Sequence, residues 1–207
     1  TSITPHGSGQ RLVTPTGIHH LKSRPRSRIR VEMWVLDELD SRGVPVTRPV
    51  PTINGADHLI TDECAWFCYT ELPGAPLWDL VGEQADDHAR ANGRACAELA
   101  LVLADLDIAS ALANGLPIRG NPRGCAELPV QVIHRDFHAG NVLHTDGQIT
   151  GYIDFDHLEL GPRMVDLVYM STSLLARMDE VGAADQWLSR WKNHLAGYLE
   201  VTQLTSA

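Results

Sequence analysis

The stretch that decides the fold runs from Val132 to Leu143 and reads V-I-H-R-D-F-H-A-G-N-V-L. A second segment, I-D-F-D from Ile153 to Asp156, follows it closely along the chain. Between them, residues 142–145 and 148–153 are predicted to pair as a hairpin, because Asp146-Gly147 is a strong two-residue turn signal. The first segment opens as a short apolar strand and continues as a loop.

The predicted hairpin would return Asp154 to the side of Asn141, which lies thirteen residues earlier. Carboxylate and amide oxygens are ligands that suit a hard cation such as Mg²⁺. Asp136, five residues before Asn141, is then placed to accept the proton of an attacking hydroxyl. Phosphoryl transfer asks for little more than such a base and a metal that neutralises phosphate charge. The three side chains therefore predict magnesium-dependent phosphoryl transfer.

The amino-terminal part of the chain has the pattern of short strands. Residues 11–22 are predicted as two strands joined by a turn at Pro15-Thr16-Gly17. Residues 6–10, H-G-S-G-Q, could cover phosphates as a glycine loop, although two glycines near a terminus are more often plain flexible chain. No clear strand is expected before this loop.

Residues 27–40 have helical spacing, with Ser27 as the expected N-cap and Gly43 just beyond the end. Glu32 falls within the apolar stripe of this helix, and a carboxylate on a buried face needs a partner. Lys22 is the candidate, because the chain has only two lysines against fifteen arginines. The alternative is that Glu32 lies at the edge of the stripe and is solvated.

The rest of the chain changes from strand-like to helix-like composition. Leu72-Pro73-Gly74-Ala75-Pro76 breaks the pattern and is the expected boundary between an amino-terminal lobe, residues 1–72, and a carboxy-terminal lobe, residues 73–207. The further expected elements are an extended segment at 45–51, paired strands at 57–60 and 65–71, and helices at 86–113, 165–177 and 183–199.

Composition limits the class of protein. The chain has 207 residues, 43% of them hydrophobic, and no apolar run approaches the roughly 20 residues that span a bilayer. A net charge of −9 argues against a nucleic-acid partner and is compatible with a cationic small substrate. Four cysteines without a C-x-x-C pair indicate free thiols in a reducing cytoplasm. The opening residues show no secretory signal, and no membrane association is expected.

The segments H-R-D-F-H-A-G-N and I-D-F-D resemble the catalytic loop and metal motif of protein-kinase-like enzymes. His138 followed by Ala139-Gly140-Asn141 makes the match similar to the aminoglycoside phosphotransferase family, which also includes choline-kinase-like and homoserine-kinase-like enzymes. The resemblance implies an α+β, two-lobed kinase-like fold with a small strand-rich lobe and a mainly helical lobe. It implies ATP and Mg²⁺ as cofactors.

The same resemblance assigns roles to individual residues. Asp136 would be the catalytic base and Asp166 would brace the catalytic loop. The remaining assignments are Asn141 and Asp154 as magnesium ligands, Lys22 with Glu32 as the phosphate-binding lysine and its helix partner, and Tyr69, Glu71 and Leu72 in the hinge that meets adenine.

Only eleven residues separate Asp154 from Asp166, too few for the activation segment of a kinase that acts on polypeptides. A small-molecule hydroxyl is therefore the expected acceptor, most of all an aminoglycoside-like or other basic antibiotic, with choline or homoserine as the alternative. Acidic residues that could attract a basic acceptor are Asp86, Asp87, Asp156 and Glu159.

Two other classes of protein remain open. His134 and His138 have the H-x-x-x-H spacing of a zinc metallohydrolase, but Arg135 stands where that motif has its glutamate. His134 is therefore expected to hold the loop, whereas His19, His20, His58, His88 and His194 are expected at the surface or its boundary. A kinase-like protein that binds nucleotide without turnover is the second alternative.

Overall fold

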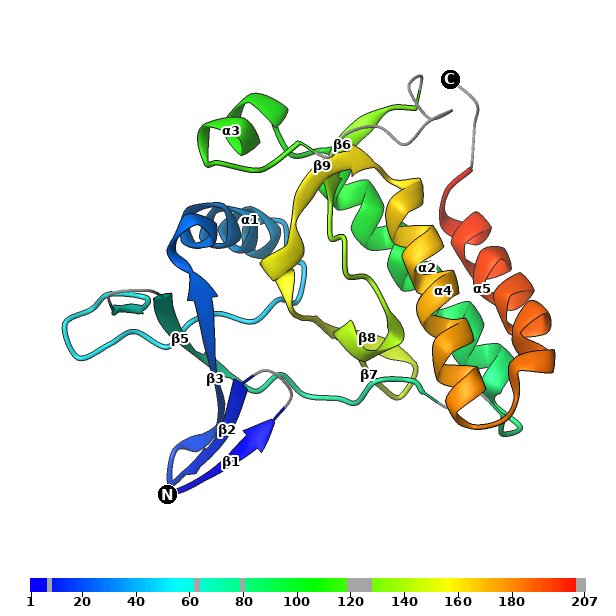
Figure 1. The fold of residues 1–207 in the computed structure, drawn as a ribbon, viewed down its shortest axis with the longest axis horizontal. Helices are drawn as coiled ribbons and strands as arrows, with labels where there is room; N and C mark the ends of the chain where they lie inside the picture. The colour runs from blue at the N-terminus through cyan, green and yellow to red at the C-terminus, as the bar shows by residue number, and fades with distance from the viewer. Residues whose placement is uncertain (7–8, 62–63, 79–80, 119–127, 204–207) are drawn as a thin grey trace.

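A computed structural model describes residues 1–6, 9–61, 64–78, 81–118 and 128–203 of the chain. A five-stranded antiparallel sheet and one long helix form the amino-terminal half, and helices cover the carboxy-terminal half (Figure 1). The sheet has the order β1-β2-β3-β5-β4. Its strands are β1 (Ser2–His6), β2 (Gly9–Thr14), β3 (Gly17–Pro25), β4 (Leu59–Ile60) and β5 (Cys64–Thr70).

The strands predicted on either side of Pro15-Thr16 are present as β2 and β3. The expectation that no strand precedes the glycine loop is wrong, because β1 pairs with β2 from Ser2↔Val13 to His6↔Gly9. Threonine and isoleucine favour this extended pairing. The loop itself falls partly on residues 7–8, which lie outside the described part of the chain.

Helix α1 (Ile29–Ser41) packs its apolar stripe against the inner face of β5. Alternate residues of β5, Ala65, Phe67 and Tyr69, are buried on that face, as the two-residue period of a strand requires. The helix was predicted correctly, but its expected cap was not. A 3₁₀ turn over Arg26–Arg28 precedes it, and no side chain caps the start of either element, so Ser27 is not an N-cap.

The carboxy-terminal half begins with α2 (Ala85–Ala104) and α3 (Ile108–Ala113). The single helix expected over 86–113 is therefore two helices. The break occurs at Asp107, whose extended backbone ends the continuity and whose carboxylate accepts a hydrogen bond of 2.7 Å from the Ser110 N–H as an N-cap. The other helices, α4 (Met164–Glu180) and α5 (Trp187–Val201), agree with the prediction.

Helices α2 and α5 approach each other at two glycines. A Cβ added at Gly93 would lie 1.9 Å from the carbonyl oxygen of His194, and one added at Gly197 would lie 2.0 Å from that of Arg90. Because only hydrogen fits at these contacts, the backbones can meet closely. This packing buries His194 to 1% exposure, so the expectation that His194 lies at the surface or its boundary is wrong.

Two small antiparallel sheets lie between the halves: β6 (Val130–Ile133) pairs with β9 (Glu159–Pro162), and β7 (Val142–Thr145) pairs with β8 (Gln148–Tyr152). β9 was not predicted. The segment expected to be extended at 45–51 forms only isolated bridges, at Val46 and Pro49. None of the helices in the described part of the chain combines the length and apolar character needed to cross a membrane.

Candidate active site

The hairpin of β7 and β8 brings Asn141 and Asp154 together, as the sequence predicts. Asp146 and Gly147 occupy the turn with φ of 50° and 77°, the left-handed values that a tight hairpin needs. At the open end, the Ile153 N–H donates to the Asn141 carbonyl oxygen at 3.1 Å. The residue after Ile153 is Asp154, which is therefore held beside Asn141 at one end of the hairpin.

The loop that carries Asp136 is held by a buried carboxylate. The backbone N–H groups of His134 and Arg135 donate to the two oxygens of Asp166, at 2.9 and 2.7 Å. The expected bracing role of Asp166 is confirmed by these bonds. Arg135 has φ of 72°, a conformation that a long side chain adopts only when its surroundings impose it. Two charge-assisted bonds to Asp166 provide that constraint.

His134 links this loop to the segment from Ile153 to Asp156. Its Nδ1 accepts from the Asp136 N–H at 3.3 Å, so the proton of the ring lies on Nε2 and is donated to the Ile153 carbonyl oxygen at 3.1 Å. His138 instead accepts from the Gly140 N–H through Nδ1 at 3.0 Å. Both rings therefore have structural hydrogen bonds. Among the described residues, no three His, Cys, Asp or Glu side chains are grouped to hold a metal ion.

Three polar groups surround the carboxylate of Asp136. The Asn141 amide nitrogen donates to its carbonyl oxygen at 2.9 Å and to its Oδ2 at 3.3 Å. The His138 Nε2 lies 3.8 Å from the same Oδ2. The hydroxyl of Tyr169 on α4 donates a hydrogen bond to Asp136, and this bond raises the pKa of Tyr169 to about 12. The carboxylate is therefore oriented from two elements.

Asp154 stands at the meeting point of the two halves of the molecule. Its φ of 69° is left-handed, which turns the side chain out of the hairpin toward β3. Lys22 Nζ lies 2.9 Å from Oδ2, and the Arg24 guanidinium lies 2.9 Å from Oδ1. Although burial raises the pKa of Asp154, the two cations lower it further, so it lies below its ordinary value. The carboxylate is ionised at neutral pH.

The predicted pair of Lys22 with Glu32 is wrong for this structure. Glu32 is buried, as expected, but its partners are Arg24 Nε at 3.3 Å and the Tyr69 hydroxyl at 3.1 Å. Burial raises the pKa of Glu32 above its ordinary value, and Arg24 opposes that shift. The reason lies in the period of β3. Lys22 and Arg24 share one face of the strand, and Arg24 lies nearer the start of α1.

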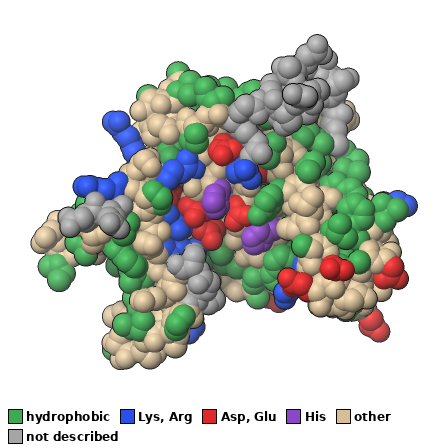
Figure 2. All heavy atoms as spheres, viewed as in Figure 1, with side chains coloured by type: hydrophobic (Ala, Val, Ile, Leu, Met, Phe, Trp, Pro, Cys, Tyr) green, Lys and Arg blue, Asp and Glu red, His purple; other side chains and the backbone are tan. Residues whose placement is uncertain are grey.

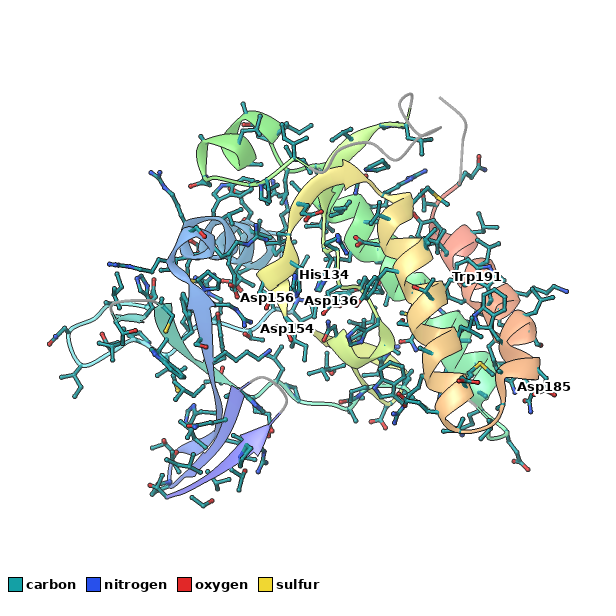
Figure 3. The ribbon with its side chains drawn as sticks, in the orientation of Figure 1. His134, Asp136, Asp154, Asp156, Asp185 and Trp191 are labelled. Carbon is teal, nitrogen blue, oxygen red and sulfur yellow. The ribbon has the colours of Figure 1, made fainter. Side chains whose placement is uncertain are left out.

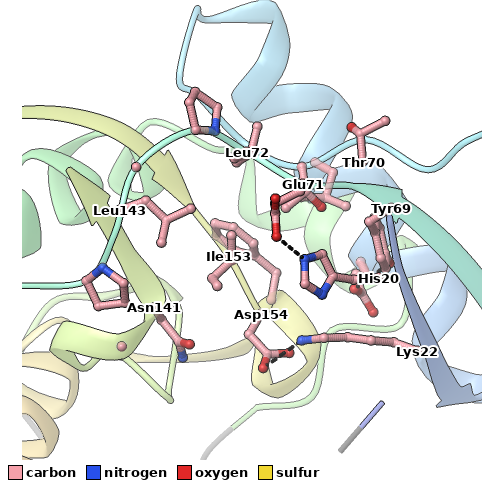
Figure 4. A pocket seen from close by; sticks show the side chains of 18 of the residues that line it. His20, Lys22, Tyr69, Thr70, Glu71, Leu72, Asn141, Leu143, Ile153 and Asp154 are labelled. Atoms are coloured by element: carbon pink, nitrogen blue, oxygen red, sulfur yellow. Dashed lines mark hydrogen bonds and ion pairs between the residues drawn. The ribbon is translucent and has the colours of Figure 1, made fainter. Parts of the chain in front are cut away.

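These residues line a cavity of about 550 Å³ between the sheet and the hairpin (Figure 4). Tyr69, Glu71 and Leu72, the residues expected in the hinge, line the cavity together with Lys22 on the neighbouring strand, and Asn141 lies across the cavity from Lys22 with Asp154 between them. Glu71 Oε1 contacts His20 Nε2 at 3.3 Å, and the Glu71 N–H donates to the Ile18 carbonyl. The backbone N–H of Glu71 is therefore already engaged within the amino-terminal half.

Acidic, basic and histidine side chains gather around the hollow at the centre of this face (Figure 2). His134, Asp136, Asp154 and Asp156 lie together there, whereas Asp185 and Trp191 lie at the far helical edge (Figure 3). Of the acidic residues expected to attract a basic acceptor, three have partners: Asp86 with Arg190, Asp156 with Arg24, and Glu159 with Arg135. Local attraction of a cation is weaker than the sequence suggests.

Two polar residues of the site were missed by sequence reasoning. Arg24 is two positions after Lys22 on β3, so the strand period could have placed it on the same face. Tyr169 lies three positions after Asp166, on the same side of α4. Neither residue stands out by type alone, and only the packing of α1 and α4 on the loop reveals their contacts.

The fold and the arrangement of Asp136, Asn141 and Asp154 define a kinase-like phosphotransferase. The model of the phosphotransferase enzyme family known as APH matches residues 18–124 and 108–202, and the chain belongs to this family. It is therefore an enzyme of the phosphoryl-transfer class, with the two-lobed α+β fold of such kinases. A search of curated protein sequences gives no match.

Several solved structures with the same fold are, by their names, antibiotic phosphotransferases. An aminoglycoside phosphotransferase from Alicyclobacillus acidocaldarius is 14% identical, with a TM-score of 0.61 over 97% of this chain and 77% of that one. An aminoglycoside-3'-phosphotransferase of type VIII is 21% identical, with a TM-score of 0.59 over 92% and 86%. A spectinomycin phosphotransferase in complex with ADP and spectinomycin is 12% identical, with a TM-score of 0.59 over 98% and 89%.

Proposed function

We propose that the chain transfers the γ-phosphoryl group of ATP, with Mg²⁺, to a hydroxyl of a small molecule. The observation that carries this proposal is the meeting of Asp136, Asn141 and Asp154 beside Lys22 at the edge of one cavity. A base, two oxygen ligands and a phosphate-binding cation are the parts that phosphoryl transfer needs. The division into a nucleotide-binding lobe up to residue 72 and a catalytic lobe beyond it is part of the same proposal.

The cavity fits a nucleotide. Its volume of about 550 Å³ lies within the range of small-ligand sites, and apolar side chains of Leu36, Leu72 and Leu143 line it. Lys22 lies at the end nearest Asp154, where phosphates would meet a cation. Related folds have been solved with ADP and with GDP, which agrees with a nucleotide at this place.

The residues present fit a magnesium ion. The nitrogen of the Asn141 amide is committed to Asp136, so its oxygen is the atom available as a ligand. Asp154 contributes an ionised carboxylate within the same cavity. An ion held by these two oxygens would neutralise charge on the transferred phosphate. The remaining chemistry belongs to Asp136, whose carboxylate would orient the acceptor hydroxyl and accept its proton.

The acceptor we propose is an antibiotic, most of all an aminoglycoside-like or other basic one. The short distance in sequence from Asp154 to Asp166 leaves no room for a peptide-binding activation segment. The related folds act, by their names, on aminoglycosides, macrolides and spectinomycin. Because Asp86, Asp156 and Glu159 are paired, attraction of a basic acceptor would come mainly from the net charge of −9.

The test is magnesium-dependent consumption of ATP across a panel of aminoglycosides, macrolides, spectinomycin, choline and homoserine. Asp136→Asn should reduce turnover on the best acceptor by about 10²- to 10⁴-fold and leave nucleotide binding nearly intact. Asp146→Asn is the matched control, because Asp146 is exposed in a turn whose left-handed backbone suits asparagine. Stimulation by choline or homoserine alone would overturn the antibiotic acceptor. Full activity of Asp136→Asn would mean that Asp136 is not the catalytic base.

A further inference from the structure

One buried guanidinium connects three carboxylates from both halves of the molecule. Arg24 Nε lies 3.3 Å from Glu32 Oε2, one terminal nitrogen lies 2.9 Å from Asp154 Oδ1, and the other lies 3.3 Å from Asp156 Oδ2. Arg24 is only 4% exposed and Glu32 only 2%. The family assignment made from the sequence gives none of these contacts a role.

A buried charge is stable only when it is paired and hydrogen-bonded. Arginine meets this condition here because its five donors lie in a rigid planar fork that can face several carboxylates at once. A lysine at the same position would offer one compact charge at the end of a flexible chain. The geometry around Arg24 therefore depends on the guanidinium and not on positive charge alone.

Lys22 has a different environment from Arg24. Its ammonium contacts the Oδ2 of Asp154 at 2.9 Å, and its side chain is 18% exposed toward the cavity. Within the described residues, Arg24 is the basic side chain that pairs with Glu32. Both cations line the cavity, but they differ in burial: Arg24 lies deep between α1 and residues 154–156, and Lys22 is the more exposed of the two.

We propose that Arg24 is a positioning residue that fixes the carboxylates of Asp154 and Asp156 relative to Glu32 on α1. In this arrangement the pair formed by a strand lysine and the helix glutamate is replaced by a pair of Arg24 with Glu32. Lys22 can then give up its contact with Asp154 and bind an incoming phosphate. The inference rests on the proposed function for its consequence in nucleotide binding, but the pairing itself can be tested without any ligand.

The charge balance gives the expected effect of losing Arg24. Glu32, Asp154 and Asp156 supply three negative charges, against the positive charges of Arg24 and Lys22. Without Arg24, the remaining cation of the two would be the half-buried Lys22, which of these three carboxylates contacts that of Asp154, and Asp154 would no longer be held at Oδ1. Mg²⁺-nucleotide binding should then weaken because its proposed carboxylate ligand is no longer held in place, while the ionic contact of Glu32 on α1 with Arg24 is lost.

The first experiment is a pair of double-mutant cycles in urea unfolding of the ligand-free protein. Each substitution is expected to raise the unfolding equilibrium constant by some factor. For the double variant Arg24→Gln with Glu32→Gln, that factor should be at least ten times smaller than the product of the factors of the two single variants. For Lys22→Gln with Glu32→Gln, the factor of the double variant should equal the product of the factors of the two single variants. Coupling of Glu32 to Lys22 in place of Arg24, or no coupling to either, would overturn the inference whatever the protein does with nucleotide.

The second experiment measures the Kd of Mg²⁺-ADP for folded Arg24→Lys, which keeps the charge and loses the fork. We expect a 10- to 100-fold weaker Kd, with KM for ATP rising in parallel and kcat changing less. Arg90→Lys is the matched control, because Arg90 pairs with Glu200 at the exposed surface of α2. The Kd of Mg²⁺-ADP for this variant should be unchanged. An unchanged Kd in Arg24→Lys would refute the positioning role. Absence of Mg²⁺-ADP binding in the unmodified protein would instead count against the proposed function.

Discussion

The hydroxyl of Tyr169 donates a hydrogen bond to Asp136, the proposed base, and the same bond keeps that hydroxyl protonated. Because the hydrogen bond raises the pKa of Tyr169 to about 12, the group remains a donor throughout the neutral and mildly alkaline range. Tyr169→Phe should lower kcat about tenfold, the effect of one lost bond to a charged group, and leave nucleotide affinity unchanged. Steady-state kinetics between pH 6 and 9 would check this.

The matched control is Tyr152→Phe, which removes a buried hydroxyl that donates to the Ala95 carbonyl oxygen at 3.1 Å. That change should cost about 1 kcal/mol of stability and leave kcat unaltered. Tyr169→Phe is therefore expected to lower kcat, whereas Tyr152→Phe is expected to lower stability and leave kcat unchanged. Equal loss of kcat in both, or none in Tyr169→Phe, would mean that Tyr169 does not orient the base.

At the level of single residues, the sequence predicts the members of the site better than their contacts. Asn141 and Asp154 come together because the hairpin that joins them folds back at a two-residue turn, and a register shift between Leu143 and His144 sets the pairing at its open end. The partner of Glu32 depends instead on how far α1 lies from β3, which is a property of tertiary packing. Two cations on one strand face satisfy the same pattern, and the sequence alone selects the wrong one.

At the level of elements, those with strong local sequence signals are again predicted, and those without them are missed. The hairpin and α1, α4 and α5 have strong local signals and are predicted, whereas β9 is missed because four residues, E-L-G-P, carry no alternation. The break between α2 and α3 is missed because leucines continue the helical spacing across it. Asp107 ends that continuity through its cap, an interaction that competes with helical periodicity and cannot be read from it.

The packing of α2 on α5 makes a prediction about pH. His194 is 1% exposed, its ring stacks on Trp191 and bonds to the Ala89 backbone, and burial lowers its pKa from 6.5 to about 4. Because the folded-state pKa is below the unfolded one, the folded protein resists protonation. The contribution of His194 to stability is complete above pH 6.5 and should fall by about 3 kcal/mol as pH drops to 4.

Urea unfolding of His194→Asn at pH 7 and pH 4 tests this expectation. Asparagine can keep a donor near the Ala89 carbonyl and does not titrate, so the variant should lose about 3 kcal/mol less than the unmodified protein on acidification. His157→Asn is the control, because that side chain is 62% exposed and should change nothing. Identical pH dependence in His194→Asn and the unmodified protein would place the acid sensitivity elsewhere.

At the level of the whole molecule, ionic contacts at the site connect the two halves. Lys22 and Arg24 on β3 reach Asp154 beyond β8, and the Arg28 guanidinium donates to the carbonyl oxygens of Asp156 and Leu158. The cations come from the amino-terminal half and their acceptors from residues 154–158. Because the cavity lies at this junction, a ligand bound there would stabilise the contact between halves as well as the local site.

Ligand binding should therefore be visible in global stability. At a Mg²⁺-ATP concentration about 100 times Kd, linkage predicts about 2.7 kcal/mol of added stability and an upward shift in Tm of roughly 5–10 °C for a chain of this size. Chelation of Mg²⁺ should remove most of that shift. Asp154→Asn should lose the magnesium-dependent part, because an amide replaces the charged ligand while the left-handed backbone, φ 69°, still suits asparagine.

Differential scanning calorimetry of both proteins, with nucleotide alone and with nucleotide plus Mg²⁺, separates the two contributions. The exposed turn variant Asp146→Asn serves again as the control and should keep the full magnesium-dependent shift. A shift in Asp154→Asn as large as that of the unmodified protein would mean that another oxygen holds the metal. A shift that is independent of Mg²⁺ in every variant would place the nucleotide in the cavity without a metal between it and Asp154.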